Sequence, residues 1–408
     1  MEDSAPDWSE LHDDILGSVF NLLECPDLLR CAAVCTAWRS VFSDARSLKI
    51  CPQRQTPCLL YCTEVAGTSA VGMYSLLEKR EYTIPLPDPP VSNRTWIGSS
   101  HGWLITADEK SDLILLNPIT GEQIALPPVT TMEHVKPIFN EDGILDKYEM
   151  LYYDGKIPRV EDTPYAFDLP RYHDIVYYKA MLSSDPSSGD CIVVLIHQPY
   201  SQISFARVGE DHWNWIPIGI HYSDCIYHEG WFYTVISSGG VDAFKLNGPS
   251  VIHKRVLKDV QQRNEKMYIV QSPWGDLLLI NRITIIPHDV NPEIEDTEMH
   301  TSDIEIYKVD IGEQKLVKLT GIGYNALFLG HNTCCCLPVK DYHMLMPNCV
   351  YMTDDDYLWL FGRHERRDVG IYSLKNNSLS NVVSLEPWKS WLPPIWMTPN
   401  LVKTGMVQ

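Results

Sequence analysis

The 408-residue sequence has no long hydrophobic run and no cluster of basic residues. No stretch approaches the roughly 20 apolar residues that cross a bilayer, and the N-terminus, MEDSAPDW, lacks the basic and apolar regions of a signal peptide. Fifty-three acidic residues against 33 basic ones give a net charge of −20, which repels the phosphate backbone of nucleic acids. We therefore expect neither a membrane nor a nucleic acid as partner, and a location in the cytoplasm, the nucleus or both.

Motifs of catalysis and cofactor binding are missing as well. The sequence has no G-x-x-x-x-G-K-[ST] phosphate loop and no H-E-x-x-H zinc motif. Residues 98–102 read G-S-S-H-G, but a nucleophile elbow leads into a helix, whereas the residues that follow predict a strand and therefore a hairpin. The aspartates at 354–356 lack the spacing of a calcium loop, so we expect them to be solvated. The sequence predicts no catalytic residue, no metal and no cofactor.

A short helical segment is present at residues 8–47. Its apolar residues recur at helical spacing, Pro26 interrupts the pattern, and Thr36 can cap a third helix. So short a chain is mostly surface and cannot bury these side chains by itself, so we expect a face that docks on another protein. The residues assigned to that face are Leu11, Ile15, Leu16, Val19, Leu22, Leu28, Val34, Cys35 and Trp38.

The motifs of this segment resemble those of an F-box. Leu11 precedes Asp14-Ile15-Leu16, and then follow Pro26-Asp27-Leu28-Leu29-Arg30 and Val34-Cys35-x-x-Trp38-Arg39. The resemblance implies a trihelical domain that binds a Skp-type adaptor and, through it, a cullin scaffold. His12 stands where the family usually has proline, which would loosen the start of the first helix. The alternative is a helical hairpin that belongs to a larger core.

Beyond residue 55 the sequence changes to many short predicted strands. Runs rich in Val, Ile, Tyr, Phe and Trp alternate with clusters of Gly, Pro, Asn and Asp, and no sustained helical period follows Ser47. Clear examples are residues 113–116, 191–196, 231–236, 277–280 and 304–309. This part of the chain is predicted to be all-β.

Turns in this region repeat with a period near 45 residues. A Gly beside a Trp precedes an apolar strand three times, and a second Gly turn follows 19, 18 and 37 residues later, the last distance being lengthened by a polar insertion. The paired turns are Gly102 with Gly121, Gly230 with Gly248, and Gly275 with Gly312. The first turns are 128 and 45 residues apart, close to three units and one unit. Such a period is typical of β-propeller blades.

We therefore expect a flexible N-terminus at residues 1–7, a helical domain at 8–47 and a propeller of six or seven blades at 55–400. Residues 129–172 show little strand pattern and predict a long loop or a degenerate blade. Closure of the ring should pair residues 58–65 with strands from 368–385. The alternative is a β-sandwich with an extra domain. Tryptophans at 213, 215, 388, 391 and 396 are either wedges between blades or binding anchors.

Several motifs of this region resemble the KIB-type β-propeller of plant F-box proteins. They are Gly98-Ser-Ser-His-Gly-Trp-Leu, Asn117-Pro-Ile-Thr-Gly, Ser272-Pro-Trp-Gly-Asp-Leu, Ala326-Leu-Phe-Leu-Gly-His-Asn, Pro347-Asn-Cys-Val-Tyr and Pro394-Ile-Trp. Together with the F-box, this implies a non-catalytic substrate-recognition subunit of an SCF-type ubiquitin ligase, whose propeller binds an unidentified target protein. The alternatives are a propeller enzyme or small-molecule sensor, and a scaffold that binds the adaptor outside any ligase.

Overall fold

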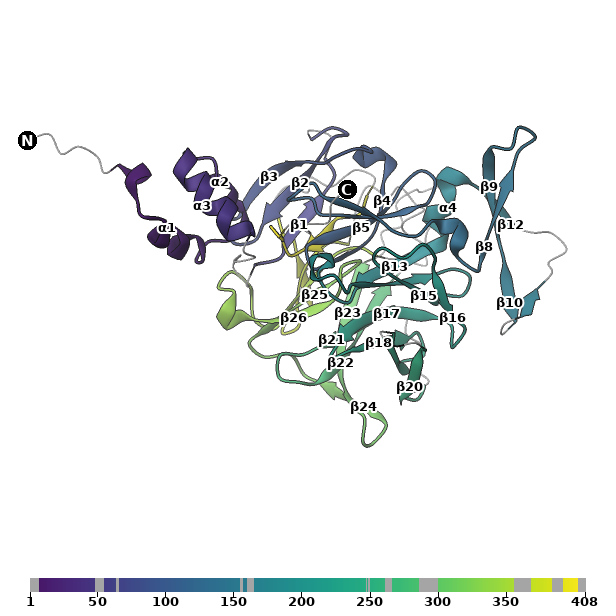
Figure 1. Ribbon diagram of the computed structural model, residues 1–408. Helices are drawn as coiled ribbons and strands as arrows, with labels where there is room; N and C mark the ends of the chain where they lie inside the picture. Colours follow the sequence, from purple (N-terminus) through teal and green to yellow (C-terminus); the bar gives the residue numbers. More distant parts are fainter. Residues whose placement is uncertain are drawn as a thin grey trace, which may run out of the picture.

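The N-terminal segment forms the small helical body at one end of the molecule (Figure 1). It consists of η1 (Trp8–Glu10), α1 (Asp13–Phe20), α2 (Cys25–Cys31) and α3 (Thr36–Ser47). This computed structural model describes residues 7–47, 55–63, 66–154, 157–159, 165–246, 248, 250–260, 266–285, 300–355, 368–383 and 392–402. Most of the expected flexible N-terminus, residues 1–6, therefore lies outside the described residues.

Helix α1 begins at a histidine cap. The Nδ1 atom of His12 accepts a hydrogen bond from the backbone N–H of Asp14 at 3.3 Å, and Asp13 and Asp14 place negative charge in the first turn. The expected loosening of the helix start is therefore wrong, because the imidazole satisfies one of the N–H groups that the helix leaves open.

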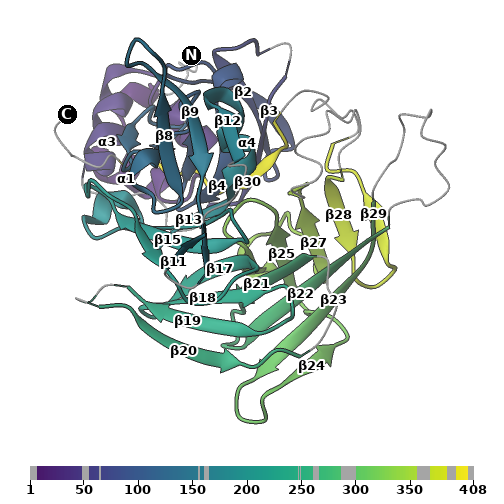
Figure 2. The same cartoon turned by 90° about the vertical axis from the view of Figure 1, so that its right-hand side faces the viewer.

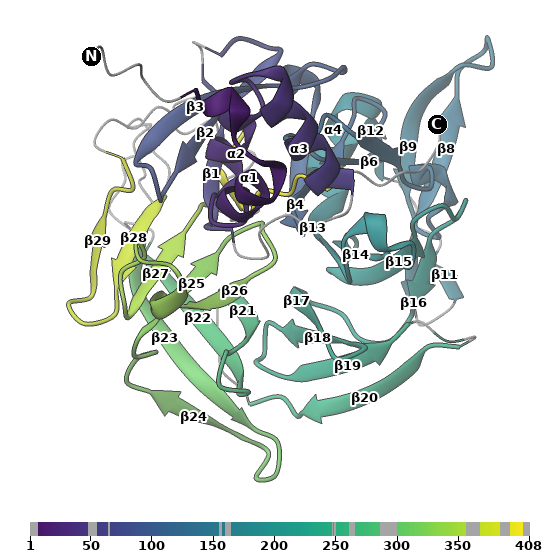
Figure 3. The same cartoon turned by 60° about the vertical axis from the view of Figure 1, so that its left-hand side comes forward.

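Six sheets of four or five strands surround a central axis, which Figure 3 shows nearly end-on. From the axis outward, the first blade consists of β30 (Ile395–Met397), β1 (Cys58–Tyr61), β2 (Ala70–Ser75) and β3 (Arg80–Pro85). The second consists of β4 (Thr95–Ser100), β5 (Trp103–Ala107), β6 (Leu113–Leu116) and β7 (Gln123–Ala125). The third consists of β13 (Tyr177–Leu182), β14 (Ile192–His197), β15 (Gln202–Arg207) and β16 (Asn214–Ile216).

Blades four to six complete the ring. The fourth blade consists of β17 (Tyr222–His228), β18 (Trp231–Ile236), β19 (Val241–Lys245) and β20 (Ile252–Leu257). The fifth consists of β21 (Lys266–Gln271), β22 (Leu277–Ile285), β23 (His300–Asp310) and β24 (Lys315–Leu319). The sixth consists of β26 (Cys335–Pro338), β25 (Asn325–Leu329), β27 (Cys349–Met352), β28 (Gly370–Ser373) and β29 (Ser378–Ser380). The strands of a blade pair antiparallel, except that β25 runs parallel to β27.

Hydrophobic clusters fill the spaces between neighbouring blades. Each of six clusters takes residues from two adjacent sheets, and together they run once around the ring. Trp396 packs against Phe328 and Tyr351 between the first and sixth blades, and the indole N–H of Trp213 donates to the carbonyl of Pro127. These two tryptophans are therefore wedges, and Trp388 and Trp391 lie outside the described residues. The predicted propeller is confirmed, and the described part of the chain forms six blades.

The ring closes where the two ends of the propeller chain pair. Strand β1 hydrogen-bonds to β2 on one side and to β30 on the other, with Leu59 opposite Trp396. The predicted partner for β1, residues 368–385, is wrong, because β28 and β29 in that region extend the sixth blade. The true partner has only three residues, too few to give a recognisable strand pattern.

The glycine turns lie where the repeat predicted them. Gly102, Gly230 and Gly275 join the first and second strands of their blades with φ of 83°, 83° and 93°, backbone conformations that favour glycine. The inference that three units separate Gly102 from Gly230 is wrong. Only two blade steps separate them, and an inserted arm accounts for the remaining length.

This arm projects from the ring on the side away from the helices (Figure 1) and faces the viewer in Figure 2. Its elements are β8 (Val135–Phe139), β9 (Leu145–Met150) and β12 (Tyr165–Asp168) in one sheet, and the hairpin β10 (Tyr152–Asp154) and β11 (Ile157–Arg159). Helix α4 (Leu169–Val176), which the sequence pattern did not predict, leads back to the third blade. The arm replaces the expected loop or degenerate blade at 129–172.

Short 3-10 turns elsewhere are η2 (Val91–Asn93), η3 (Val129–Thr131), η4 (Pro186–Ser188) and η5 (Val339–Asp341).

Ion pairs between blades lie buried near the axis. Lys179 of the third blade contacts Asp224 of the fourth at 2.6 Å, and its ammonium donates to the carbonyl of Gly330 at 2.8 Å. Lys266 and Arg282 of the fifth blade each lie 3.4 Å from the carboxylate of Asp355, which follows β27 of the sixth. The ion pairs join adjacent blades through charge, and the hydrogen bond to Gly330 links the third blade to the sixth.

The expected solvation of the aspartates at 354–356 is therefore wrong. Asp354 and Asp355 are only 4% and 2% exposed, and Asp356 lies outside the described residues. Burial by itself would raise the pKa of Asp355, but Lys266 and Arg282 hold it at about 2. The sequence could not show this pairing because the partner cations lie in another blade.

Removal of one partner from the Lys179–Asp224 pair should destabilise the ring strongly. Lys179→Met leaves a buried carboxylate unpaired, so we expect the free energy of unfolding to fall by about 3–5 kcal/mol, with partial recovery in Lys179→Met/Asp224→Leu. Urea unfolding followed by tryptophan fluorescence measures both. The control is Lys136→Met, which breaks a more exposed pair with Glu149 and should cost less than about 1 kcal/mol. Equal losses in the two single variants would contradict the role of the central pair.

Asp355 should make part of the stability depend on pH. Its pKa is lower in the folded chain than the ordinary value of 3.8, so its stabilisation, about 2 kcal/mol, is present above pH 4 and is lost as the pH falls toward 2. We expect the stability difference between the wild type and Asp355→Asn to shrink as the pH falls from 4 to 2 in urea unfolding. Asp146→Asn, at an exposed position of the arm, should show no such trend. A constant difference for Asp355→Asn would exclude the ion pairs as its source.

Candidate functional site

The helical segment is seated on the propeller by apolar packing and polar contacts. Leu401 and Ile119, both from the propeller, pack with the helical core. Arg30 of α2 contacts Glu78 at 2.9 Å and its guanidinium lies over the ring of Tyr82, both in the first blade. The side-chain oxygen of Gln55 accepts from the backbone N–H of Cys25 at 2.7 Å. These contacts fix the direction in which the helices face.

One face of these helices carries exposed apolar side chains that no part of the described chain covers. Ile15, Val19 and Leu22 follow one another at helical spacing on and just after α1, and are 54%, 38% and 85% exposed. Val34, in the turn before α3, is 58% exposed. Trp8, which was not predicted, adds a large exposed indole at 60%. We call these five residues the apolar stripe.

The other predicted docking residues do not form an open face. Leu16 and Leu28 are 0% and 3% exposed, because the helical turn directs them toward α3 and Leu401. Leu11, Cys35 and Trp38 are only half-buried, and all but Cys35 pack against this core. The prediction that Leu16 and Leu28 lie on the docking face is therefore wrong. For Leu11, Cys35 and Trp38 it stays a prediction.

Trp38 forms a bridge between the core and the stripe. Its ring meets that of Phe20 edge-on at 5.8 Å, and its indole N–H donates to the carbonyl of Trp8 at 2.9 Å. The hydrogen bond holds η1 against α3. A flat row of Ile, Val, Leu and Trp offers no acid, base or nucleophile, and can serve only to bind.

A cavity of about 430 Å³ lies on the same face of the ring as the helices. Phe328, Trp396 and Met397 supply apolar walls, and Ser100, His101 and Asn332 supply polar ones. Burial lowers the pKa of His101, against an opposing effect of Asp185, and the lining contains no Lys or Arg among the residues that the structure describes. The cavity therefore suits a small uncharged molecule better than an anion.

The G-S-S-H-G segment in this wall is a hairpin turn, as predicted. Residues 101 and 102, with φ of 53° and 83°, connect β4 to β5. The hydroxyl of Ser100 has no hydrogen-bond partner among the described residues, so no base activates it as a nucleophile. Those residues also contain no group of three His, Cys, Asp or Glu side chains able to hold a metal ion. None of the described helices is long and apolar enough to span a bilayer.

Comparison with known proteins gives matches over both parts of the chain. The family described as KIB1-4 beta-propeller matches residues 73–373, and the F-box domain matches residues 8–50. F-box only protein 7 of Arabidopsis thaliana is 23% identical over 343 residues, 82% of each chain. Two putative F-box proteins of the same plant are 20% and 23% identical, each over 96% of this chain and 97% of their own length.

The two matches follow each other in the order of the two structural parts. The F-box match coincides with the trihelical segment that carries the apolar stripe, and the propeller match covers most of the six-bladed ring. The chain therefore belongs to the KIB1-4 β-propeller family and carries an F-box domain at its N-terminal end.

Proposed function

We propose that this chain is the substrate-recognition subunit of an SCF-type cullin-RING ubiquitin ligase. The apolar stripe docks on a Skp-type adaptor, which links the chain to a cullin, and the propeller binds a target protein. The observation that carries the proposal is the exposure of Ile15, Val19, Leu22 and Val34 on an F-box that has its own buried core, which includes Leu16, Phe20 and Leu28.

The chain has no chemical step to perform in this scheme. A target held on the propeller lies close to a ubiquitin-charged enzyme, and tethering raises its effective concentration there. A rigid connection matters for that task, and the contacts of Arg30, Gln55 and Leu401 supply it. The proposed location is the cytoplasm, the nucleus or both, where such ligases work.

Two alternatives make different demands on the same structure. A scaffold outside any ligase would bind the adaptor without a cullin, so reconstitution with adaptor, cullin and RING subunit distinguishes it by the absence of the larger complex. A small-molecule sensor is favoured by the 430 Å³ cavity. A sensor function and adaptor binding are compatible in one chain, because the cavity and the apolar stripe share no residue.

Truncation of the stripe should abolish adaptor binding. We expect Ile15→Ala/Leu22→Ala to weaken binding of a purified Skp-type adaptor at least about 25-fold, because two exposed anchors are removed, each worth more than about 1 kcal/mol. Isothermal titration calorimetry measures the affinity. Unfolding curves should match the wild type, since neither side chain belongs to the core.

The matched control replaces two isoleucines of the propeller whose exposure is close to the 54% of Ile15. Ile311 and Ile252 are 53% and 51% exposed, so Ile311→Ala/Ile252→Ala removes similar apolar area far from the F-box and should bind the adaptor normally. Unchanged adaptor binding by Ile15→Ala/Leu22→Ala would rule out the stripe as the docking face.

A further inference from the structure

Four aromatic rings form a continuous row from the arm onto the third and fourth blades. The ring centroids of Tyr165 and Tyr152 are 6.0 Å apart, those of Tyr152 and Tyr200 are 5.9 Å apart, and those of Tyr200 and His221 are 6.4 Å apart. The residues come from β12, β10, the turn between β14 and β15, and the loop before β17. We call them the tyrosine row.

Three of the four members of the row are open to solvent. Tyr165 and Tyr200 are 58% and 37% exposed, and His221 is exposed as well. Ile220, next to His221, is 45% exposed and adds apolar surface. Large aromatic side chains with a polar tip are the residues that most often anchor protein interfaces, because they lose little conformational entropy on binding.

The backbone that presents these rings is held in unusual conformations. Tyr200, Ser201 and His221 have φ of 65°, 49° and 64°, the left-handed region that side chains other than glycine rarely adopt. Two hydrogen bonds keep the loops together, from the N–H of His221 to the carbonyl of Tyr200 at 2.7 Å and from the N–H of Tyr222 to the carbonyl of Ser201 at 3.0 Å. Such conformations persist where the surrounding structure enforces them, commonly at binding sites.

An aromatic cluster around the buried residues His134 and His197 holds the arm against the third blade. His134 lies edge-on to Trp215 at 4.7 Å and 5.2 Å from His197, and Tyr153 lies 5.1 Å from Trp215. Burial lowers the pKa of His134 to about 3 and of His197 to about 4, so both stay neutral near pH 7. The row is therefore fixed in place before any partner arrives.

The sequence of the arm, which supplies Tyr152 and Tyr165, is acidic. Residues 133–168 contain nine acidic and four basic residues, a net charge of −5 without histidine. Two of those four cations are already paired, Lys136 with Glu149 at 2.9 Å and Lys147 with Asp168 at 3.2 Å. An approaching cation would meet both an acidic field and electron-rich ring faces.

We propose that the tyrosine row is the target-binding surface and that it receives an arginine-rich segment of the target protein. Guanidinium planes would stack on the exposed faces of Tyr165 and Tyr200, while the acidic excess of the arm attracts the segment. The chain uses the same contact elsewhere, since the guanidinium of Arg30 lies 4.9 Å from the ring centre of Tyr82. This assignment rests on the proposed role as substrate receptor.

A defined peptide tests the chemistry directly. The probe is a fluorescein-labelled (Arg-Gly-Ser)₄ peptide, with (Lys-Gly-Ser)₄ as the charge-matched comparison, titrated against the full chain by fluorescence anisotropy at physiological salt. We expect the arginine peptide to bind at least tenfold more tightly than the lysine peptide, because only the planar guanidinium stacks well. Equal affinities for the two peptides would mean that they bind only by general electrostatic attraction to an acidic chain. That result would overturn the proposal.

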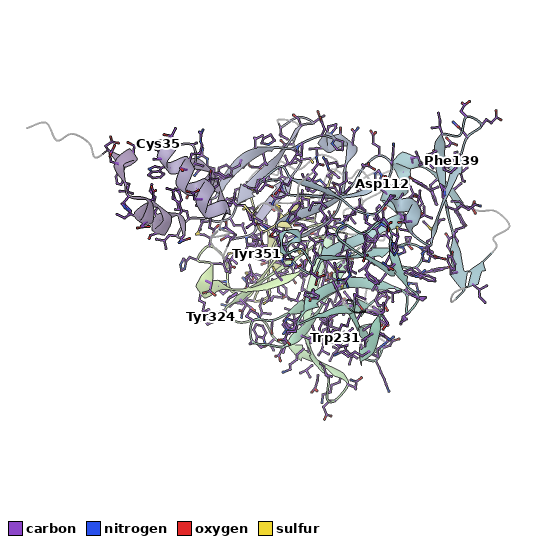
Figure 4. All side chains as sticks on the ribbon, in the orientation of Figure 1. Cys35, Asp112, Phe139, Trp231, Tyr324 and Tyr351 are labelled. Atoms are coloured by element: carbon purple, nitrogen blue, oxygen red, sulfur yellow. The ribbon has the colours of Figure 1, made fainter. Side chains whose placement is uncertain are left out.

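Variants then place the binding on the row. Tyr165→Ala/Tyr200→Ala should weaken the arginine peptide at least tenfold, whereas Tyr165→Phe/Tyr200→Phe should retain it because the ring faces remain. The matched control is Tyr324→Ala, which removes a tyrosine that is 82% exposed on the side of the ring away from the arm (Figure 4). Wild-type affinity in the double alanine variant, with an unchanged unfolding curve, would contradict the assignment.

Adaptor binding, measured on the same proteins, separates this inference from the proposed function. The row variants should bind the Skp-type adaptor like the wild type, since the arm and the F-box lie at opposite ends of the molecule (Figure 1). Loss of peptide selectivity with normal adaptor binding would overturn the tyrosine row alone. Absence of adaptor binding with selective peptide binding would overturn the ligase assignment and leave the row as a binding surface.

Discussion

The pairing of β1 with β30 is the contact on which the rest of the structure depends. Three residues, Ile395 to Met397, supply the innermost strand of the first blade and join the end of the propeller chain to its beginning. Without them the first blade would lose its inner strand, and the ring would have an open edge beside the axis. Trp396 at the centre of this strand also packs against Phe328 and Tyr351, so the same short segment closes the ring and fills the space to the sixth blade.

Ring closure also positions the F-box. The chain that leaves β30 continues along the cavity wall, and Leu401 enters the core of the helical domain together with Leu16, Phe20 and Leu28. On the other side of the closure, Gln55 just before β1 binds the start of α2. Both ends of the propeller chain therefore hold the F-box, which explains why one side of its apolar surface is covered and the opposite side, the apolar stripe, is left exposed.

Local chemistry made the repeating parts of this fold predictable. Gly102, Gly230 and Gly275 are needed where the backbone turns with positive φ, so the hairpins could be found from sequence, and the F-box helices from their apolar spacing. Contacts between distant segments could not be found in this way. Examples are the pairing of β30 with β1, the ion pair of Asp355 with Arg282, and the packing of Leu16 with Leu401. Each of them joins segments that are far apart in the sequence. The docking face was accordingly predicted as a helical stripe without knowledge of which side the propeller covers.

The rigidity of the ring gives the two candidate surfaces a fixed separation. Ion pairs such as Lys179–Asp224 and the hydrophobic clusters between blades resist relative movement of the blades, because a well-packed core deforms little. The apolar stripe and the tyrosine row are each anchored to this ring, the first by Arg30 and Leu401 and the second by the cluster around His134. A receptor that acts by proximity needs such a spacer, since a flexible one would spread the bound target over a larger volume and lower its effective concentration near the reacting partner.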